Sequence, residues 1–161
     1  MGTSVEYQIE LRGVAGSDLA LILAWRSDRE IMQYLPSASE KLTWEEHEEY
    51  WRKAYHRDWM IDQVFGCYLL APHRSIGIVH IIPGTGEVGI IIGAKSLWGK
   101  GIATKALTLM LEKAKEYALT KEKVWAAIHP ENIASQKAFT KVGFVNTHEP
   151  GRNGQERWKL K

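Results

Sequence analysis

The sequence lacks several features that would assign it to a specialised class of protein. Among its 161 residues there is one cysteine, Cys67, which excludes an internal disulfide and a cysteine-based metal site. Its apolar runs are only a few residues long, such as residues 90–92, whereas a membrane-spanning helix needs about 20. Positions 1–30 contain no basic segment followed by an apolar core, so no secretory signal is expected. These absences predict a protein of the reducing cytoplasm with no membrane partner.

Neither sign of charge is in large excess, since the net charge is only +2, so a large nucleic-acid-binding surface is not expected. The two halves nevertheless differ. Residues 1–80 carry 8 basic and 12 acidic side chains (net −4), and residues 81–161 carry 13 and 7 (net +6). This asymmetry favours an anionic ligand on the second half and a cationic one on the first. With 45% hydrophobic and 25% charged residues, the chain is predicted to form a single domain over residues 1–161.

The hydrophobic pattern predicts a mixed α/β domain with the element order β-α-α-β-β-β-α-β-α-β-β. The predicted strands cover residues 5–12, 60–71, 75–82, 88–92, 123–128, 142–148 and 156–160. The predicted helices cover residues 18–26, 43–55, 99–118 and 133–141. Thr43 and Glu46 form a capping box for the second helix, and Asn132 and Gly143 suit the start and the end of the last one.

Three glycine-containing segments need separate interpretation. Residues 84–89 match the G-x-G-x-x-G dinucleotide pattern, but a strand is predicted where that fingerprint requires a helix. Residues 93–100 are close to a P-loop, yet Gly101 stands where a magnesium-binding Ser or Thr is required. Residues 97–104 lie between a buried strand and a strong helix, so their small side chains would let backbone N–H groups approach a phosphate. A plain strand-to-helix turn is the alternative for this last segment.

This loop and the segments after it resemble the GCN5-related N-acetyltransferase (GNAT) superfamily. The matching residues are Trp98-Gly99-Lys100-Gly101-Ile102-Ala103, then Asn132 and Ser135, and finally Gly143-Phe144. Trp98 departs from the general pattern of the family but is similar to the branch that contains ribosomal-protein N-terminal acetyltransferases. The resemblance implies an α+β fold with a mixed, mostly antiparallel sheet of about six to seven strands flanked by about four helices.

The resemblance further implies acetyl-CoA as the cosubstrate and no metal. The pyrophosphate is expected on the backbone of the loop, and the pantetheine arm is expected along the preceding strand. Asn132 would hold the arm, or would act only as a helix cap. The residues expected to bind acetyl-CoA are Ile90, Ile91, Ile92, Trp98, Gly99, Lys100, Gly101, Ile102, Ala103, Thr104, Asn132 and Phe139.

Catalytic roles also follow from the resemblance, which implies direct attack of an amine on the thioester. The amine must lose a proton, and Glu87 is the candidate general base, acting through water. A solvent-facing glutamate is the alternative. Many members of the family protonate the leaving thiolate with a Tyr, but Phe139 occupies that position here, so Ser135 is the candidate donor. The acceptor site is expected from the N-terminal half and the last hairpin, with Tyr34 and Trp44 as candidate walls; core packing is their alternative role.

The predicted function is an acetyl-CoA-dependent N-acetyltransferase that modifies the primary amine of a small molecule or of a protein N-terminus. An amino-sugar or aminoglycoside acceptor is the alternative, because residues 25–28 and 44–47 resemble enzymes of that kind. A non-catalytic acyl-CoA sensor is the alternative from another class, since the usual Tyr is missing. The sequence does not distinguish a homodimer from a monomer.

Overall fold

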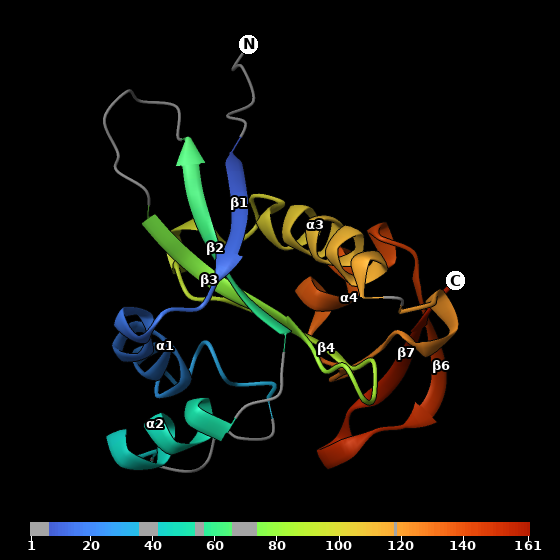
Figure 1. Ribbon diagram of the computed structural model, residues 1–161. Helices are drawn as coiled ribbons and strands as arrows, with labels where there is room; N and C mark the ends of the chain where they lie inside the picture. Colours follow the sequence, from blue (N-terminus) through green and yellow to red (C-terminus); the bar gives the residue numbers. More distant parts are fainter. Residues whose placement is uncertain (1–6, 36–41, 54–56, 66–73, 118) are drawn as a thin grey trace.

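Figure 1 shows the computed structural model of the protein, which describes residues 7–35, 42–53, 57–65, 74–117 and 119–161. The strands are β1 (Gln8–Gly13), β2 (Arg57–Phe65), β3 (Arg74–Ile81), β4 (Val88–Ile92), β5 (Trp125–Ile128), β6 (Phe144–Pro150) and β7 (Glu156–Leu160). The helices are α1 (Leu19–Arg26), α2 (Trp44–Lys53), α3 (Ile102–Glu116) and α4 (Ile133–Lys141). This arrangement confirms the predicted α+β class with mostly antiparallel strands and four helices. No helix in these ranges has the length and hydrophobicity needed to cross a membrane.

The observed starts of α2 and α3 can be compared with the predicted ones. The capping box of α2 is confirmed, because Thr43 Oγ1 accepts the Glu46 N–H at 3.2 Å and the Glu46 carboxylate accepts the Thr43 N–H at 3.0 Å. The prediction for α3 was wrong at its start, since this helix begins at Ile102 and not at residue 99. The reason is the backbone of Gly99 and Gly101, whose φ angles of 75° and 79° lie outside the helical region.

The second and third strands pair in antiparallel orientation, but their ends differ from the predicted ranges of 60–71 and 75–82. β2 begins at Arg57, earlier than the predicted residue 60, and β3 begins at Arg74, one residue before its predicted start. Residues 66–73, which include the end of the second predicted strand, lie outside the described residues, as does Val5 at the start of the first.

The strands form two antiparallel sheets that meet at one point. The first sheet has the order β1-β2-β3-β4 and the second has the order β5-β7-β6, and Figure 1 shows β6 and β7 as a separate group near α3 and α4. A parallel bridge joins Glu87 to Trp125, and beside it the Trp125 N–H donates to Gly86 O at 3.1 Å. A Cβ atom at Gly86 would overlap Lys123 O, so only glycine fits at this junction. Within the described residues, the rest of β4 faces β5 without forming a ladder.

Two hydrophobic cores cover the two faces of the first sheet. Successive residues of a strand point to opposite faces, so Val79 joins the larger core with α3 whereas Ile78 joins the smaller core with α1. Along β4, Ile90 and Ile92 pack against the larger core and Ile91 packs against the smaller one. The apolar run at residues 90–92 therefore contributes to both faces, although its three side chains are only half-buried.

A buried histidine fastens α2 to α1. His47 has 0% exposure, and its Nε2 lies 2.8 Å from Leu19 O. Because a carbonyl oxygen only accepts hydrogen bonds, Nε2 carries the proton. Burial lowers the pKa of His47, so its ring is neutral at pH 7. Figure 1 shows these two helices together, away from α3 and α4.

Candidate functional site

An open cavity of about 660 Å³ lies where the edges of the two sheets separate. Its walls come from the segment after α1, from β4, from the loop and first turn of α3, from the end of β5 and from α4. The structure brings most of the predicted site residues to this cavity. Those that line it are Tyr34, Ile90, Ile91, Ile92, Trp98, Gly99, Gly101, Ile102, Ala103, Thr104, Asn132, Ser135 and Phe139.

The edge of β4 presents backbone hydrogen-bonding groups to the cavity at alternate residues. Gly93 N–H donates to Ile76 O at 2.8 Å, which identifies the odd-numbered residues of β4 as the ones bonded to β3. Ile91 therefore uses its N–H and C=O inside the sheet, whereas Ile90 and Ile92 turn theirs toward the cavity. An extended ligand with amide groups would find its partners at Ile90 in particular.

Three backbone N–H groups at the start of α3 are open to the cavity. The first N–H bonded within the helix is that of Lys105, which donates to Gly101 O at 3.2 Å, and no described side chain caps the helix. The N–H groups of residues 102–104 are therefore available to an anion, and the helix dipole adds partial positive charge. A Cβ atom built on Gly99 or Gly101 would meet nothing within 4 Å. This space leaves room for a phosphate group beside the helix.

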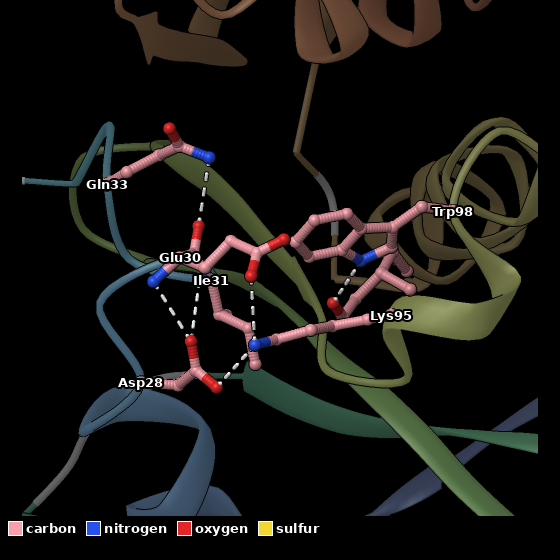
Figure 2. A network of polar contacts seen from close by, with 7 residues as sticks. Asp28, Glu30, Ile31, Gln33, Lys95 and Trp98 are labelled. Carbon is pink, nitrogen blue, oxygen red and sulfur yellow. Dashed lines mark hydrogen bonds and ion pairs between the residues drawn. The ribbon is translucent and has the colours of Figure 1, made fainter.

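Two side chains fasten the loop between β4 and α3 to its surroundings (Figure 2). Trp98 Nε1 donates to Ile92 O at 2.8 Å, so this carbonyl at the end of β4 already has a partner. Lys95 Nζ lies 2.8 Å from Asp28 Oδ2 and 3.2 Å from Glu30 Oε2. The hydrogen bond from Lys95 lowers the pKa of Asp28 and, in turn, raises the pKa of Lys95, so both remain charged at neutral pH. Glu30, which lines the cavity, is thus paired with a cation.

α4 contributes three of the predicted residues to the cavity wall. Asn132 Oδ1 accepts the Ser135 N–H at 3.2 Å, which confirms Asn132 as the N-cap. Since Oδ1 has this partner, the Nδ2 amide group is the part of Asn132 left to contact a ligand. Ser135 is half-buried beside it. Phe139 is 3% exposed and packs edge-on against Phe144 with ring centroids 4.9 Å apart, so it forms an apolar wall without a proton donor.

Glu87 lies at the junction of the two sheets and is not among the residues that line the cavity. Its carboxylate forms an ion pair with Arg152, which comes from the loop between β6 and β7. A general base needs a free lone pair directed at the proton it removes, so this guanidinium would have to share or release the carboxylate. The assignment of Glu87 as a base stays a prediction. The expected role of Lys100 in binding acetyl-CoA also stays a prediction, because Lys100 is exposed and does not line the cavity.

Tyr34, His129 and Gln155 form a polar part of the cavity wall. The rings of Tyr34 and His129 have centroids 5.4 Å apart, and Gln155 Nε2 lies 3.4 Å from Tyr34 O. Tyr34 therefore lies on the cavity wall, and its role in binding an acceptor stays a prediction. Trp44 does not line the cavity and lies 42% exposed on α2, with its ring 6.1 Å from that of His47. Its acceptor role stays a prediction that the cavity does not support.

The polar residues that sequence reasoning missed come from segments without a motif. The last hairpin was expected to contribute to the acceptor site, but neither Arg152 nor Gln155 was singled out within it. His129 follows β5, and Glu30 lies in the irregular segment after α1. Their positions depend on pairings between distant segments, and no local pattern in the sequence marks them.

Comparisons with known proteins agree with this geometry. Residues 8–145 match the family described as Acetyltransferase (GNAT) domain. A relative from Methanocaldococcus jannaschii, an uncharacterized protein, is 33% identical over 153 residues; the match covers 91% of this chain but only 30% of that relative's length. The crystal structure of a domain from Methanocaldococcus jannaschii has a TM-score of 0.85 and 31% identity, covering 96% of this chain and 99% of that one.

Two further structures are acetyltransferases crystallised with coenzyme A. Spermidine N-acetyltransferase from Vibrio cholerae, in complex with CoA and spermine, has a TM-score of 0.74 and 25% identity and covers 94% of this chain and 93% of that one. Aminoglycoside acetyltransferase AAC(6')-Ib, in complex with coenzyme A and kanamycin, has a TM-score of 0.74 and 16% identity, with 96% and 95% covered, and shows the shared fold.

The family match includes β1 to α4, and thus every wall of the cavity except Gln155. The α+β fold expected from the resemblance is confirmed by the solved structures. The chain therefore belongs to the GNAT acetyltransferase superfamily.

Proposed function

We propose that this protein is an N-acetyltransferase that transfers the acetyl group of acetyl-CoA to a primary amine. One observation carries the proposal: a single cavity joins the open strand edge at Ile90 to the open helix start at residues 102–104. The strand edge suits the amide-bearing pantetheine arm, and the helix start suits a pyrophosphate. The complexes of two related acetyltransferases with CoA support this assignment.

Each part of the chain then has a distinct task. Acetyl-CoA supplies an acetyl group activated as a thioester. The N–H groups of the 99–104 loop bind phosphate, and Asn132 Nδ2 is the donor assigned to the pantetheine arm or to a bridging water. The Ile90 N–H, turned toward the cavity, is the donor assigned to the thioester carbonyl, where negative charge develops during transfer.

Proton transfer is assigned to two residues, Glu87 and Ser135, which contribute unequally to the rate. Glu87 takes the proton from the amine through water, which requires Arg152 to loosen its ion pair with the carboxylate. Ser135, at the cavity wall on α4, donates to the leaving thiolate because Phe139 has no proton to give. A thiolate with an ordinary pKa of about 8.5 leaves without complete protonation, so the contribution of Ser135 is the smaller one.

The acceptor is a primary amine of a small molecule or of a protein N-terminus. The former draws support from the structures of relatives with spermine and with kanamycin, and an amino sugar or aminoglycoside remains the leading alternative. The latter draws support only from the similarity of the Trp98 loop to ribosomal-protein N-terminal acetyltransferases.

A non-catalytic acyl-CoA sensor is the second candidate, and two observations favour it. Phe139 stands where a proton donor is common, and the candidate base is paired with Arg152. Such a protein would bind acetyl-CoA in the same cavity without consuming it.

Thiol release distinguishes the two candidates. The full chain is incubated with acetyl-CoA and, separately, spermine, kanamycin, glucosamine and a peptide with a free N-terminus, and acetylated product is identified by mass spectrometry. We expect amine-dependent release with at least one of them. Calorimetric binding of acetyl-CoA without release from any amine would support the sensor instead, and absence of binding would contradict both.

A further inference from the structure

The side chain of Gln155 has an unusual position for a neutral polar group. Gln155 immediately precedes β7 and is only 5% exposed, yet it lines the cavity. Its backbone is fixed within the hairpin, because its N–H donates to Arg152 O at 3.0 Å and its C=O accepts the Gly151 N–H at 2.6 Å. The side chain therefore extends from a rigid base into the space between the sheets.

The orientation of the Gln155 amide is determined by its neighbours. Nε2 lies 3.4 Å from Tyr34 O and 3.5 Å from Ala127 O, and both of these atoms accept hydrogen bonds. If the amide were flipped, Oε1 would face two carbonyl oxygens and would be repelled by both. The two N–H bonds of Nε2 are thus directed at the protein backbone, and Oε1 is on the other side.

Gln155 Oε1 is an acceptor that reaches open space. Among the described residues it has no hydrogen-bond partner, and it is not one of the fully enclosed polar atoms without one, which are His47 Nδ1, Trp51 Nε1 and Arg157 Nε. Water would otherwise occupy this place, and a ligand N–H that replaces it would keep a hydrogen bond to Oε1. The cavity supplies the space for that ligand.

The charges around Gln155 indicate which nitrogen group fits. Glu30, the acidic residue in the described cavity wall, is already paired with Lys95. A carboxylate would stabilise an ammonium ion and keep it protonated, whereas a neutral amide oxygen orients an amine with a much weaker preference for its charged form. Transfer requires the uncharged amine, so an amide oxygen suits this step.

We propose that Gln155 Oε1 accepts a hydrogen bond from the acceptor amine and positions its nitrogen for acetyl transfer. This inference rests on the proposed function. It makes Gln155 a substrate-binding residue whose second role, through Nε2, is to hold the Tyr34 segment against β5. The His129 ring, whose centroid is 5.4 Å from that of Tyr34, accepts the Glu131 N–H on Nδ1 at 3.1 Å, so its Nε2–H is a donor for other polar groups of the same substrate.

Gln136 provides a matched control for the structural part of this role. Its Nε2 also donates to two backbone carbonyls, His129 O at 3.4 Å and Pro130 O at 2.8 Å, but Gln136 does not line the cavity. Gln155→Met and Gln136→Met each lose the same kind of bridge. Only the first loses an acceptor in the cavity.

The test measures steady-state kinetics with whichever of spermine, kanamycin, glucosamine and the peptide the wild-type protein acetylates best. Gln155→Met should raise KM for that amine at least tenfold and leave the calorimetric Kd for acetyl-CoA within about twofold, while Gln136→Met should change neither. Gln155→Glu should shift the pH dependence of kcat/KM to higher pH, because the new carboxylate stabilises the protonated amine; Gln136→Glu should not.

Four results would overturn the inference. A wild-type KM in folded Gln155→Met, or a raised Kd for acetyl-CoA as its main defect, would show that Oε1 does not bind the amine. Equal KM changes in both Met variants would make Gln155 a structural bridge only. If the wild-type protein acetylates none of the four amines, the proposed transferase function fails. That outcome is distinguishable from failure of the Gln155 inference alone, in which the wild-type protein is active.

Discussion

At the scale of single residues, two glycines decide whether the cavity can accept a phosphate. Gly99 and Gly101 both have positive φ and both border empty space. A side chain at either position would strain the backbone and would occupy the space that a ligand needs. Separating these two effects requires a glycine that has positive φ but does not line the cavity.

Gly154 is that control, since it has φ 80° and open space around its Cβ position but does not line the cavity. Alanine at Gly101 or at Gly154 should cost roughly 1–2 kcal/mol of stability, because each position has a left-handed backbone. Only Gly101→Ala should also weaken acetyl-CoA binding, at least tenfold or about 1.4 kcal/mol, in a calorimetric titration. Equal affinities for acetyl-CoA in the two folded variants would contradict phosphate binding at this loop.

Glu87 is the residue whose catalytic role is least supported by its surroundings. If it takes the proton from the amine, Glu87→Gln should lower turnover about 10²-fold at neutral pH, with the loss shrinking at high pH where free amine is plentiful. Acetyl-CoA affinity should hardly change, because glutamine keeps the size of the side chain. The pH–rate profile with the best amine measures this. A profile like that of the wild type would assign the base to water or to the acceptor side of the cavity.

At the scale of secondary structure elements, the start of α4 combines folding and binding in one side chain. Asn132→Ala should cost about 1 kcal/mol of stability through loss of the cap. Asn132→Asp keeps the capping oxygen near Ser135 N–H but loses the Nδ2 donor, so its stability in urea unfolding should match or exceed that of the wild type. Its affinity for acetyl-CoA should fall. Unchanged affinity in this variant would mean that Asn132 is only a cap.

The packing of α2 on α1 should depend on pH through His47. Its pKa is lowered in the folded state, mainly by burial, so below about pH 6.5 the unfolded chain binds more protons than the folded one. Stability from this site is complete above about pH 6.5 and is lost progressively as the pH falls from there through the lowered pKa of the folded state. Urea unfolding at pH 7 and pH 5 should show a smaller loss in His47→Gln, which donates to Leu19 O without titrating. The same loss in both proteins would contradict this account.

At the scale of the whole molecule, the sequence predicted most of the elements and the small-residue loop before α3 because these depend on local patterns. Asn132 and Thr43 were assigned as caps correctly, since a cap is a relation between residues three positions apart. Gln155 and the pairing of Glu87 with Arg152 were not predicted, since each depends on segments far apart in the chain. The separation of the strands into two sheets also depends on such long-range pairing.

The alternating edge of β4 has a consequence for the exchange of its amide hydrogens with water. Gly89 and Ile91 donate within the sheet and should exchange slowly, whereas the Ile90 N–H faces the open cavity and should exchange orders of magnitude faster. Hydrogen exchange followed by NMR would therefore show slow and fast amides alternating along this strand. Adding CoA should slow the exchange of the Ile90 amide until the alternation disappears. This one amide would then report directly on an occupied cavity, even before any acceptor for the acetyl group is known.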